Sequence, residues 1–224
     1  MTGRAASTQQ TANGGLARLR DFVVAVTDCV SGDVKGAAVA ERVRPFLKEL
    51  VRYDDWLPDA FAKAHPEHYQ QYLLYCDPLE RFSVVSFVWN AGQSTPVHDH
   101  TVWGLVGVLR GIETSQSYRI EQGRLMPGET ERLQGGDVGA VGPEIGDIHK
   151  VTNARTDGGA SISIHVYGAN IGAVRRHVFD DRGIATKDFV SGYSNIVLPN
   201  IWDRSDDVRS RRAPSQGSAA AHGR

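Results

Sequence analysis

Two histidines separated by a single residue have the spacing that metal binding requires. His98 and His100 flank Asp99, so on a β-strand their imidazoles would project to the same face. Two imidazoles on one face can share a metal ion at ligand distances of about 2.0–2.2 Å. Because a lone His-x-His pair also arises by chance, its meaning depends on the rest of the sequence.

A second group of polar residues lies in segment 161–168. Ser163, His165 and Tyr167 alternate with Ile164 and Val166, so on a strand the three polar side chains would share one face. The serine hydroxyl can then fix one imidazole nitrogen, while the other nitrogen holds the tyrosine phenol. This group is either a hydrogen-bond ladder that stabilises a sheet or part of a catalytic site.

The histidine pair also belongs to a longer pattern that resembles the two motifs of the cupin superfamily. The matching residues are Gly92, His98, His100 and Gly111 in the first motif and Gly146, His149 and Asn153 in the second. Gly104 stands where the superfamily has an acidic ligand. The resemblance therefore implies a metal ion held by His98, His100 and His149 alone.

Three histidines without the acid, together with Ser163, His165 and Tyr167, resemble the cysteine dioxygenase family of thiol dioxygenases. The resemblance covers roughly residues 69–176. It implies Fe(II) as the cofactor and oxidation of a small thiol by O2 to the sulfinic acid, with catalytic roles for these three residues. In mammalian members a cysteine cross-links to the tyrosine; Gly104 occupies that position, so no cross-link is expected, as in bacterial members.

Residues that bind the substrate carboxylate distinguish the branches of this family. The mammalian type has an arginine ahead of the barrel, whereas the bacterial branch resembling 3-mercaptopropionate dioxygenase has a glutamine, which Gln71 matches best. A glutamine is neutral, so a cation is expected from Arg175 or Arg176, and we favour Arg176. The alternative is that both arginines are solvated surface residues. The expected substrate is 3-mercaptopropionate or L-cysteine, with mercaptosuccinate left open.

The elements that must position these residues fall into two parts. Apolar residues spaced by three and four over 16–51 predict two amphipathic helices, broken near Ser31 and Gly32, and 58–75 continues the helical character. Short β-branched runs with glycine turns follow from Phe82. The expected strands are 82–89, 102–109, 114–120, 136–141, 150–153 and 161–167, with irregular strands at 195–202. This pattern predicts a mainly β protein, a cupin barrel or jelly roll with an N-terminal helical cap.

Composition limits the remaining classes of function. The 224 residues carry 25 basic and 26 acidic side chains, so no uniform basic field favours nucleic acid. Two cysteines and no long apolar window predict a cytoplasmic protein without a membrane partner. We expect one cupin domain over 16–203, helical over 16–75 and a barrel over 82–203, with flexible tails at 1–15 and 204–224. Oligomeric state is not predicted.

Three other interpretations compete with a thiol dioxygenase. Another cupin metalloenzyme, such as a ring-cleaving dioxygenase or a sugar-phosphate isomerase, would share the histidines, but isomerases of this fold normally keep the acid that Gly104 replaces. A non-catalytic cupin that binds a small ligand would not require Ser163, His165 and Tyr167 in register. A structural barrel with satisfied histidines would not require the paired motif spacing.

Overall fold

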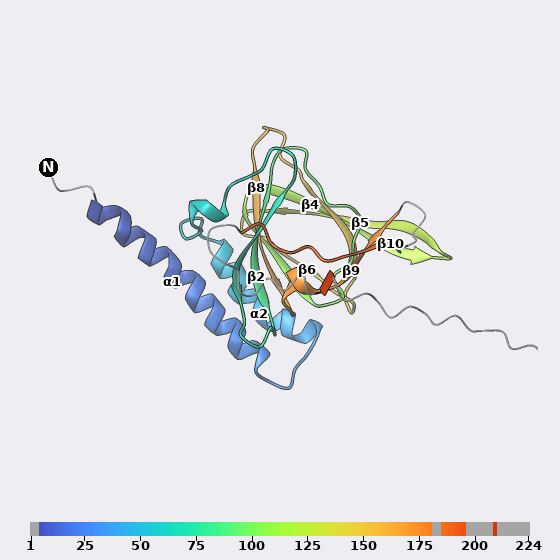
Figure 1. Cartoon of the computed structure of the whole chain (residues 1–224), viewed down its shortest axis with the longest axis horizontal. Helices are drawn as coiled ribbons and strands as arrows, with labels where there is room; N and C mark the ends of the chain where they lie inside the picture. The colour runs from blue at the N-terminus through green and yellow to red at the C-terminus, as the bar shows by residue number, and fades with distance from the viewer. Residues whose placement is uncertain (1–4, 181–184, 196–207, 210–224) are drawn as a thin grey trace, which may run out of the picture.

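Two helices precede a series of strands (Figure 1). The structure is a computed structural model and describes residues 5–180, 185–195 and 208–209. The helical elements are α1 (Ala5–Val30), α2 (Ala37–Val51), η1 (Asp59–Phe61) and η2 (Ile171–Ala173). The strands are β1 (Gln70–Cys76), β2 (Ser83–Trp89), β3 (Gly104–Arg110), β4 (Ile112–Glu121), β5 (Arg124–Gln134), β6 (Val138–Val141), β7 (Ile148–Asn153), β8 (Ser161–Tyr167), β9 (Arg176–Phe179) and β10 (Ala185–Phe189).

The strands form antiparallel sheets in which neighbours in space are often distant in sequence. One sheet has the order β1-β2-β8-β3-β6, a second has the order β5-β4-β7, and β9 pairs with β10. Interior side chains from both large sheets, including Val85, Val141, Val151 and Tyr167, pack into one cluster. This interleaved arrangement is the double-stranded β-helix of the cupin fold. The predicted mainly β cupin fold with N-terminal helices is confirmed.

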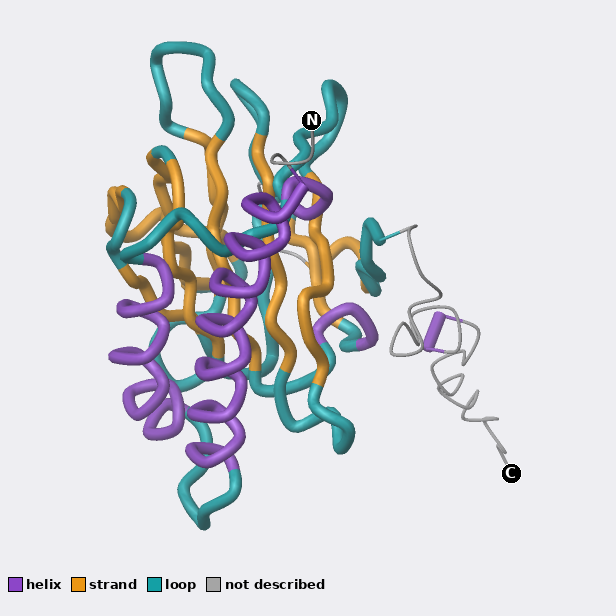
Figure 2. The backbone as a smooth tube through the Cα atoms, turned by 90° about the vertical axis from the view of Figure 1, so that its left-hand side faces the viewer, coloured by secondary structure: helices purple, strands orange, loops and turns teal. Residues whose placement is uncertain are grey.

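The two helices cover the outer face of the five-stranded sheet. Figure 2 shows them side by side across the strands. Val43 and Leu47 of α2 are fully buried in the core cluster that also contains apolar residues of β2, β3 and β8. The contact requires a glycine, because a Cβ at Gly107 would lie 2.9 Å from Val51 Cγ1 and 3.0 Å from Leu47 Cγ. The helices thus shield the apolar residues on this face of the sheet from water.

Strand β8 has the alternation that the sequence predicts. Ile162, Ile164 and Val166 pack in the cluster beneath the helices. The polar residues between them point into the barrel, and all of β8 is buried. Because β8 lies between β2 and β3 at the centre of its sheet, its polar face is held in the interior of the protein.

The helical character predicted for 58–75 is wrong over its second half. Gln70–Cys76 is the edge strand β1, paired antiparallel with β2, and only η1 is helical in this stretch. Tyr72 and Leu74 pack toward the helices, while Leu73 belongs to the interior cluster. A short run of tyrosine and leucine fits the periodicity of a helix or of a strand. Its backbone pairing with β2 makes this segment a strand. The outcome matters because β1 carries Gln71.

Other boundaries also differ from the sequence predictions. Helix α1 begins at Ala5, so residues expected as tail form its first turns, and β5, β9 and β10 were not predicted. Asn195 hydrogen-bonds through its amide to both backbone groups of Leu73, as expected for a segment wrapping the barrel. Residues 196–202 and most of the predicted C-terminal tail lie outside the described residues. No helix in the described ranges has both the length and the hydropathy that crossing a membrane requires.

Candidate metal centre

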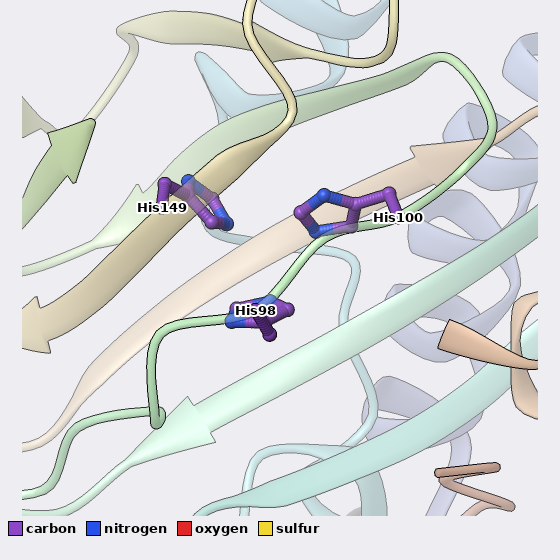
Figure 3. Close-up of side chains that lie close together, drawn as sticks. All are labelled: His98, His100 and His149. Atoms are coloured by element: carbon purple, nitrogen blue, oxygen red, sulfur yellow. The ribbon is translucent and has the colours of Figure 1, made fainter. Parts of the chain in front are cut away.

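The structure brings the side chains of His98, His100 and His149 together in the barrel. Their candidate ligand nitrogens all lie within 4.8 Å of one another, and all three residues are buried (Figure 3). His98 and His149 are joined through their backbones, since each N–H donates to the carbonyl oxygen of the other at 3.0 Å. We call these residues the histidine triad. The first two lie in the segment between β2 and β3, with isolated bridges at His98 rather than the expected regular strand.

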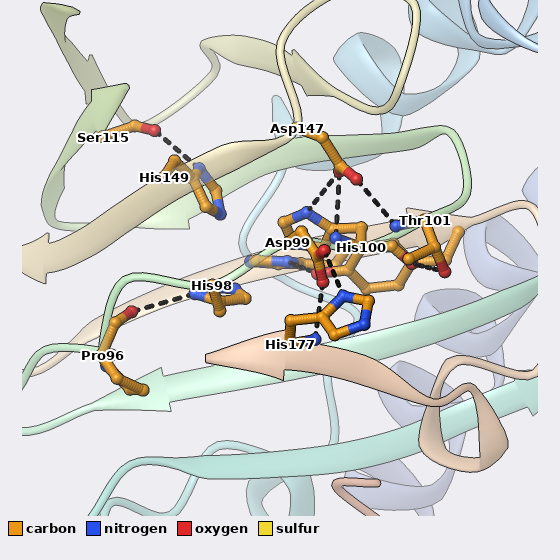
Figure 4. A network of polar contacts seen from close by, with 11 residues as sticks. Pro96, His98, Asp99, His100, Thr101, Ser115, Asp147, His149 and His177 are labelled. Carbon is orange, nitrogen blue, oxygen red and sulfur yellow. Dashed lines mark hydrogen bonds and ion pairs between the residues drawn. The ribbon is translucent and has the colours of Figure 1, made fainter. Parts of the chain in front are cut away.

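In each triad residue, Nδ1 is engaged by a partner outside the cluster (Figure 4). His98 Nδ1 lies 3.0 Å from the Pro96 carbonyl oxygen, and His100 Nδ1 lies 3.2 Å from Asp147 Oδ1. Both partners only accept, so Nδ1 carries the proton and Nε2 has a free lone pair. His149 Nδ1 lies 2.9 Å from Ser115 Oγ. The triad is therefore arranged to present Nε2 atoms as neutral ligands.

Burial keeps the triad in the uncharged form that metal binding needs. Loss of hydration lowers the pKa of His98 and of His149 well below the ordinary value, and neighbouring histidines lower both further. The pKa of His100 is also lowered by burial, but the hydrogen bond to Asp147 opposes the shift. A metal ion competes with protons for these nitrogens, so neutral imidazoles favour binding at neutral pH.

Asp147 is a functional residue that sequence reasoning missed. Besides His100 Nδ1, it accepts the backbone N–H of His100 at 3.0 Å and that of Thr101 at 2.8 Å. Thr101 has φ of 61°, so the chain turns sharply just after His100 and the carboxylate holds this turn. The available signal was its position two residues before His149. Ser115 gave no signal, because its role depends on β4 pairing with β7.

Replacing Asp147 with Asn should weaken metal binding by about 10- to 100-fold, because groups that orient metal-ligating histidines commonly contribute that much. The Asn side chain keeps the size but lacks the charge that stabilises His100 Nδ1–H. Metal affinity can be measured by competition with a chromophoric chelator. Asp99→Asn is the matched control, and equal weakening in both variants would contradict the assignment.

Asp99 lies between two triad residues but faces away from the cluster. Its carboxylate accepts the backbone N–H and the Nδ1–H of His177, both at 2.7 Å. Asp99 therefore supports the structure and is not part of the triad. His177 lies on β9, so the contact ties the segment between β2 and β3 to the β9–β10 hairpin.

Ser163, His165 and Tyr167 form a continuous hydrogen-bonded chain on β8. Ser163 Oγ lies 2.8 Å from His165 Nε2, and His165 Nδ1 lies 2.7 Å from the Tyr167 hydroxyl. Burial lowers the pKa of His165 well below its ordinary value and raises that of Tyr167 well above its own, so both groups are neutral. The Tyr167 ring stacks on the His100 ring with 5.5 Å between centroids. We call this group the polar chain.

A cavity of about 200 Å³ joins the triad to the polar chain. Residues from several elements line it, including Gln71, His98, His149, His165, Tyr167 and Arg176. Among the described residues that line this histidine cavity, none is Asp or Glu. Its size suits a small molecule, and its charged side chains are cationic, so it favours a small anion.

The structure separates the two arginines that the sequence left as alternatives. Arg176 is 4 % exposed, lines the histidine cavity and donates from Nη2 to Ser191 Oγ at 2.7 Å. Its Nε is buried without a hydrogen-bond partner among the residues that the structure describes, and its guanidinium lies 4.6 Å from the centre of the Phe189 ring. Arg175 instead donates to the Val208 carbonyl oxygen and pairs with Asp188. A buried arginine with an unused donor is suited to a ligand carboxylate.

Gln71 reaches the same cavity from the edge strand β1. Its amide Nε2 donates to the Gly192 carbonyl oxygen. A primary amide has two N–H donors, so one remains for a ligand. The backbone of Gln71 is also held, because its N–H donates to Ser194 Oγ at 3.1 Å and its carbonyl oxygen accepts from Ser194 N–H at 2.8 Å.

The position where a cupin acid would stand is closed by Tyr167. A Cβ at Gly104 would lie 2.8 Å from Tyr167 Cδ1 and 2.9 Å from Val141 Cγ2. Contacts this short do not occur in folded proteins without a shift of the neighbours. The ring of Tyr167 therefore occupies the space beside the triad that a fourth, acidic ligand would need.

A second group with metal-ligand atoms, His65, Glu67 and His68, is of a different kind. Glu67 and His68 are exposed, and the imidazole rings of His65 and His68 lie 3.9 Å apart between centroids at an interplanar angle of 30°. His65 Nδ1 already accepts the backbone N–H of Glu67 at 3.2 Å. The candidate ligand atoms of this group also lie within 4.8 Å of one another, but two of its three residues are exposed, whereas the whole triad is buried.

The fold and the triad define a cupin-type barrel with a candidate metal site, and comparison with known proteins adds only fold-level likeness. No protein-family model matches the chain. An uncharacterised protein with a double-stranded β-helix domain from Klebsiella pneumoniae is similar at 18% identity over 50% of this chain and 85% of that chain, with TM-score 0.36. A cupin superfamily protein from Desulfitobacterium hafniense is similar at 17% identity over 52% and 93%, with TM-score 0.39. An oxalate oxidase in complex with the substrate analogue glycolate is similar at 14% identity over 48% of this chain and 56% of that chain, with TM-score 0.38.

Proposed function

We propose that the chain is a non-haem Fe(II) thiol dioxygenase that oxidises a small thiol carboxylate, 3-mercaptopropionate or L-cysteine. One observation carries the proposal: a single cavity is lined by two triad histidines, by His165 and Tyr167 of the polar chain, and by Arg176, whose Nε has no hydrogen-bond partner in the described part of the chain. A carboxylate would pair with Arg176, and a thiol would lie toward the triad. The absence of Asp and Glu among the described lining residues favours an anionic substrate.

The donor set of the triad fits a divalent transition metal. Three neutral imidazoles with their Nδ1 atoms tied back present nitrogen ligands and leave the positive charge of the ion uncompensated. A thiolate supplies the missing negative charge and is itself a soft ligand. When bound, Fe(II) would supply the redox chemistry that O2 activation requires.

The proposed reaction balances without an added reductant. The thiol R–SH and one O2 give the sulfinic acid R–SO2H: the sulfur–hydrogen bond and the oxygen–oxygen bond break, two sulfur–oxygen bonds form, and the proton ends on the product acid or in water. Sulfur loses four electrons and the two oxygen atoms gain them. The protein therefore has to hold the thiol, exclude bulk water and position one hydrogen-bond donor.

The side chains of the cavity divide these tasks. Arg176 and the free amide proton of Gln71 bind the substrate carboxylate, and the buried position of Arg176 strengthens that contact. Tyr167, neutral and held by His165, donates a hydrogen bond to the substrate. Ser163 sets which nitrogen of His165 carries the proton.

The proposal is tested by metal analysis of the purified protein followed by oxygen uptake with a panel of thiols. The panel contains 3-mercaptopropionate, L-cysteine and mercaptosuccinate, with cysteamine as the thiol that lacks a carboxylate. We expect iron-dependent uptake of one O2 per thiol, a sulfinic acid product, and little uptake with cysteamine. Absence of iron dependence and of thiol-stimulated uptake would overturn the enzyme proposal and favour a cupin with another metal reaction or a non-catalytic ligand-binding role.

His165→Asn should lower turnover by about 100-fold while leaving iron content unchanged. His165 holds the Tyr167 hydroxyl at 2.7 Å and has no direct place in the triad; loss of a positioned proton donor commonly costs about that much. Turnover and iron occupancy are to be measured on the same preparation. If iron occupancy fell in step with turnover, the polar chain would be structural support for the triad.

A further inference from the structure

Glu113, on β4, is a buried acid next to the polar chain that the proposed reaction does not use. It is 1 % exposed, and its Oε2 has no hydrogen-bond partner among the described residues. Ser161 Oγ lies 2.8 Å from Oε1, and the Ser163 hydroxyl is close enough to the carboxyl group to lower its pKa. Loss of hydration raises the pKa of Glu113 to about 7, and the two serine hydroxyls oppose the rise.

The hydrogen bonds of Ser161 indicate that Glu113 carries a proton. Ser161 Oγ lies 3.0 Å from the Arg110 carbonyl oxygen and 2.8 Å from Glu113 Oε1. A carbonyl oxygen only accepts, and a serine hydroxyl has one proton to donate. Both contacts are satisfied when Ser161 donates to Arg110 and Glu113 donates to Ser161. If Glu113 were ionised, the single proton of Ser161 could serve only one of its two contacts. The other contact, to the Arg110 carbonyl oxygen or to Glu113 Oε1, would then bring two oxygen atoms close together without a proton between them.

The state of Glu113 decides where the single proton of Ser163 goes. Trp89 Nε1–H donates to Ser163 Oγ at 3.3 Å, so Ser163 accepts there and has its own proton for either His165 Nε2 or Glu113. A carboxylate is the stronger acceptor and would take it. A neutral carboxyl group is a weak acceptor, so the proton then goes to His165 Nε2.

We propose that Glu113, in its neutral form, is a positioning residue that fixes the direction of the polar chain so that Tyr167 donates its hydroxyl proton into the histidine cavity. With Ser163 donating to Nε2, neutral His165 carries its proton on Nδ1 and donates it to the Tyr167 oxygen. The phenolic proton is then free to point into the cavity. The direction of these hydrogen bonds does not depend on the proposed function. The donation of the Tyr167 proton to a substrate does rest on it.

Ionised Glu113 reverses every bond in the chain. Ser163 donates to the carboxylate, His165 Nε2–H donates to Ser163 Oγ, and His165 Nδ1 accepts the Tyr167 proton. Tyr167 then offers the cavity only an acceptor. The same set of heavy-atom distances, 2.8 Å from Ser163 Oγ to Nε2 and 2.7 Å from Nδ1 to the phenol oxygen, serves both directions.

The other titratable groups near Glu113 come from three strands. Glu131 on β5 and His149 on β7 line the same small internal cavity as Glu113, and His165 on β8 lies one hydroxyl away. Burial keeps both histidines neutral, so neither changes charge near pH 7. Glu131 is exposed and serves as the matched control for replacing a carboxylate beside this cavity.

The test measures the tautomer of His165 by nitrogen-15 NMR in the metal-free, full-length chain, with the signals assigned by their loss in His165→Asn. We expect the Nδ1–H form well below pH 7 and the Nε2–H form well above it, with the midpoint near the pKa of Glu113. Glu113→Gln should hold the Nδ1–H form throughout, because an amide stays neutral. Glu131→Gln should switch as the unaltered protein does.

Two further measurements keep the inference testable if Glu113→Gln does not fold. Infrared difference spectra of the unaltered protein should show a buried carboxylic acid that ionises near pH 7. Ser163→Ala should keep that signal while abolishing the switch at His165, because the link is broken. A single His165 tautomer at every pH, or a switch that survives in Glu113→Gln, would overturn the inference. A switch without thiol oxidation would instead leave it standing and overturn the proposed function.

Discussion

His149→Ala should abolish metal binding and with it all oxygen uptake. Within the described residues the triad provides three protein ligands, and Tyr167 closes the position beside Gly104 where a fourth could stand. Loss of one ligand leaves two imidazoles, and we expect affinity to fall by well over 100-fold, more than the loss of an orienting group costs. Metal content after reconstitution and dialysis, measured by elemental analysis, checks the prediction.

The control for His149→Ala is a histidine outside the triad. His68 is an exposed residue of the second group, so His68→Ala should bind metal as the unaltered protein does. His149 also pairs through its backbone with His98, and alanine keeps both of those bonds. Circular dichroism should therefore show a folded barrel in both variants. Retention of one tightly bound metal ion in His149→Ala, or its loss in His68→Ala, would contradict the triad as the metal site.

The parts of the site that sequence predicted are those set by local periodicity. Ser163, His165 and Tyr167 share a face because side chains alternate along any strand, and β8 is a regular strand. His98 and His100 were expected to converge because they would alternate on a regular strand, but they do not lie on one. His98 is held by reciprocal backbone bonds to His149, and a carboxylate holds the turn after His100. Spacing predicted the cluster but not the means of holding it.

The parts that sequence did not predict depend on contacts between distant segments. Ser115 reaches His149 only because β4 pairs with β7, and Asp147 reaches His100 only because the segment before β7 lies beside the segment before β3. β5 was missed because most of its residues are exposed and polar, so it has no apolar alternation to detect. Arg176 is the first residue of β9 and Arg175 lies just before it. Which of the two faces the cavity depends on how β9 lies against distant segments, including its pairing with β10.

Within the site, Arg176 should control which thiols the protein accepts. It is the buried cation of the histidine cavity, its Nε lacks a hydrogen-bond partner among the described residues, and Ser191 and Phe189 hold the guanidinium in place. A hydrogen bond between charged groups contributes about 1.5–3 kcal/mol, and leaving a buried carboxylate unpaired costs more. Arg176→Gln should therefore lower kcat/KM for 3-mercaptopropionate by about 100-fold or more.

Arg175→Gln is the matched control, because that side chain pairs with Asp188 and the Val208 backbone rather than lining the cavity. It should leave kcat/KM within a few-fold. The panel of thiols separates a specific role from general damage: Arg176→Gln should change the weak activity with cysteamine little, since no carboxylate is present to lose its partner. An equal loss with cysteamine and with 3-mercaptopropionate would mean that Arg176 supports the barrel, and the carboxylate would then have to bind at another residue.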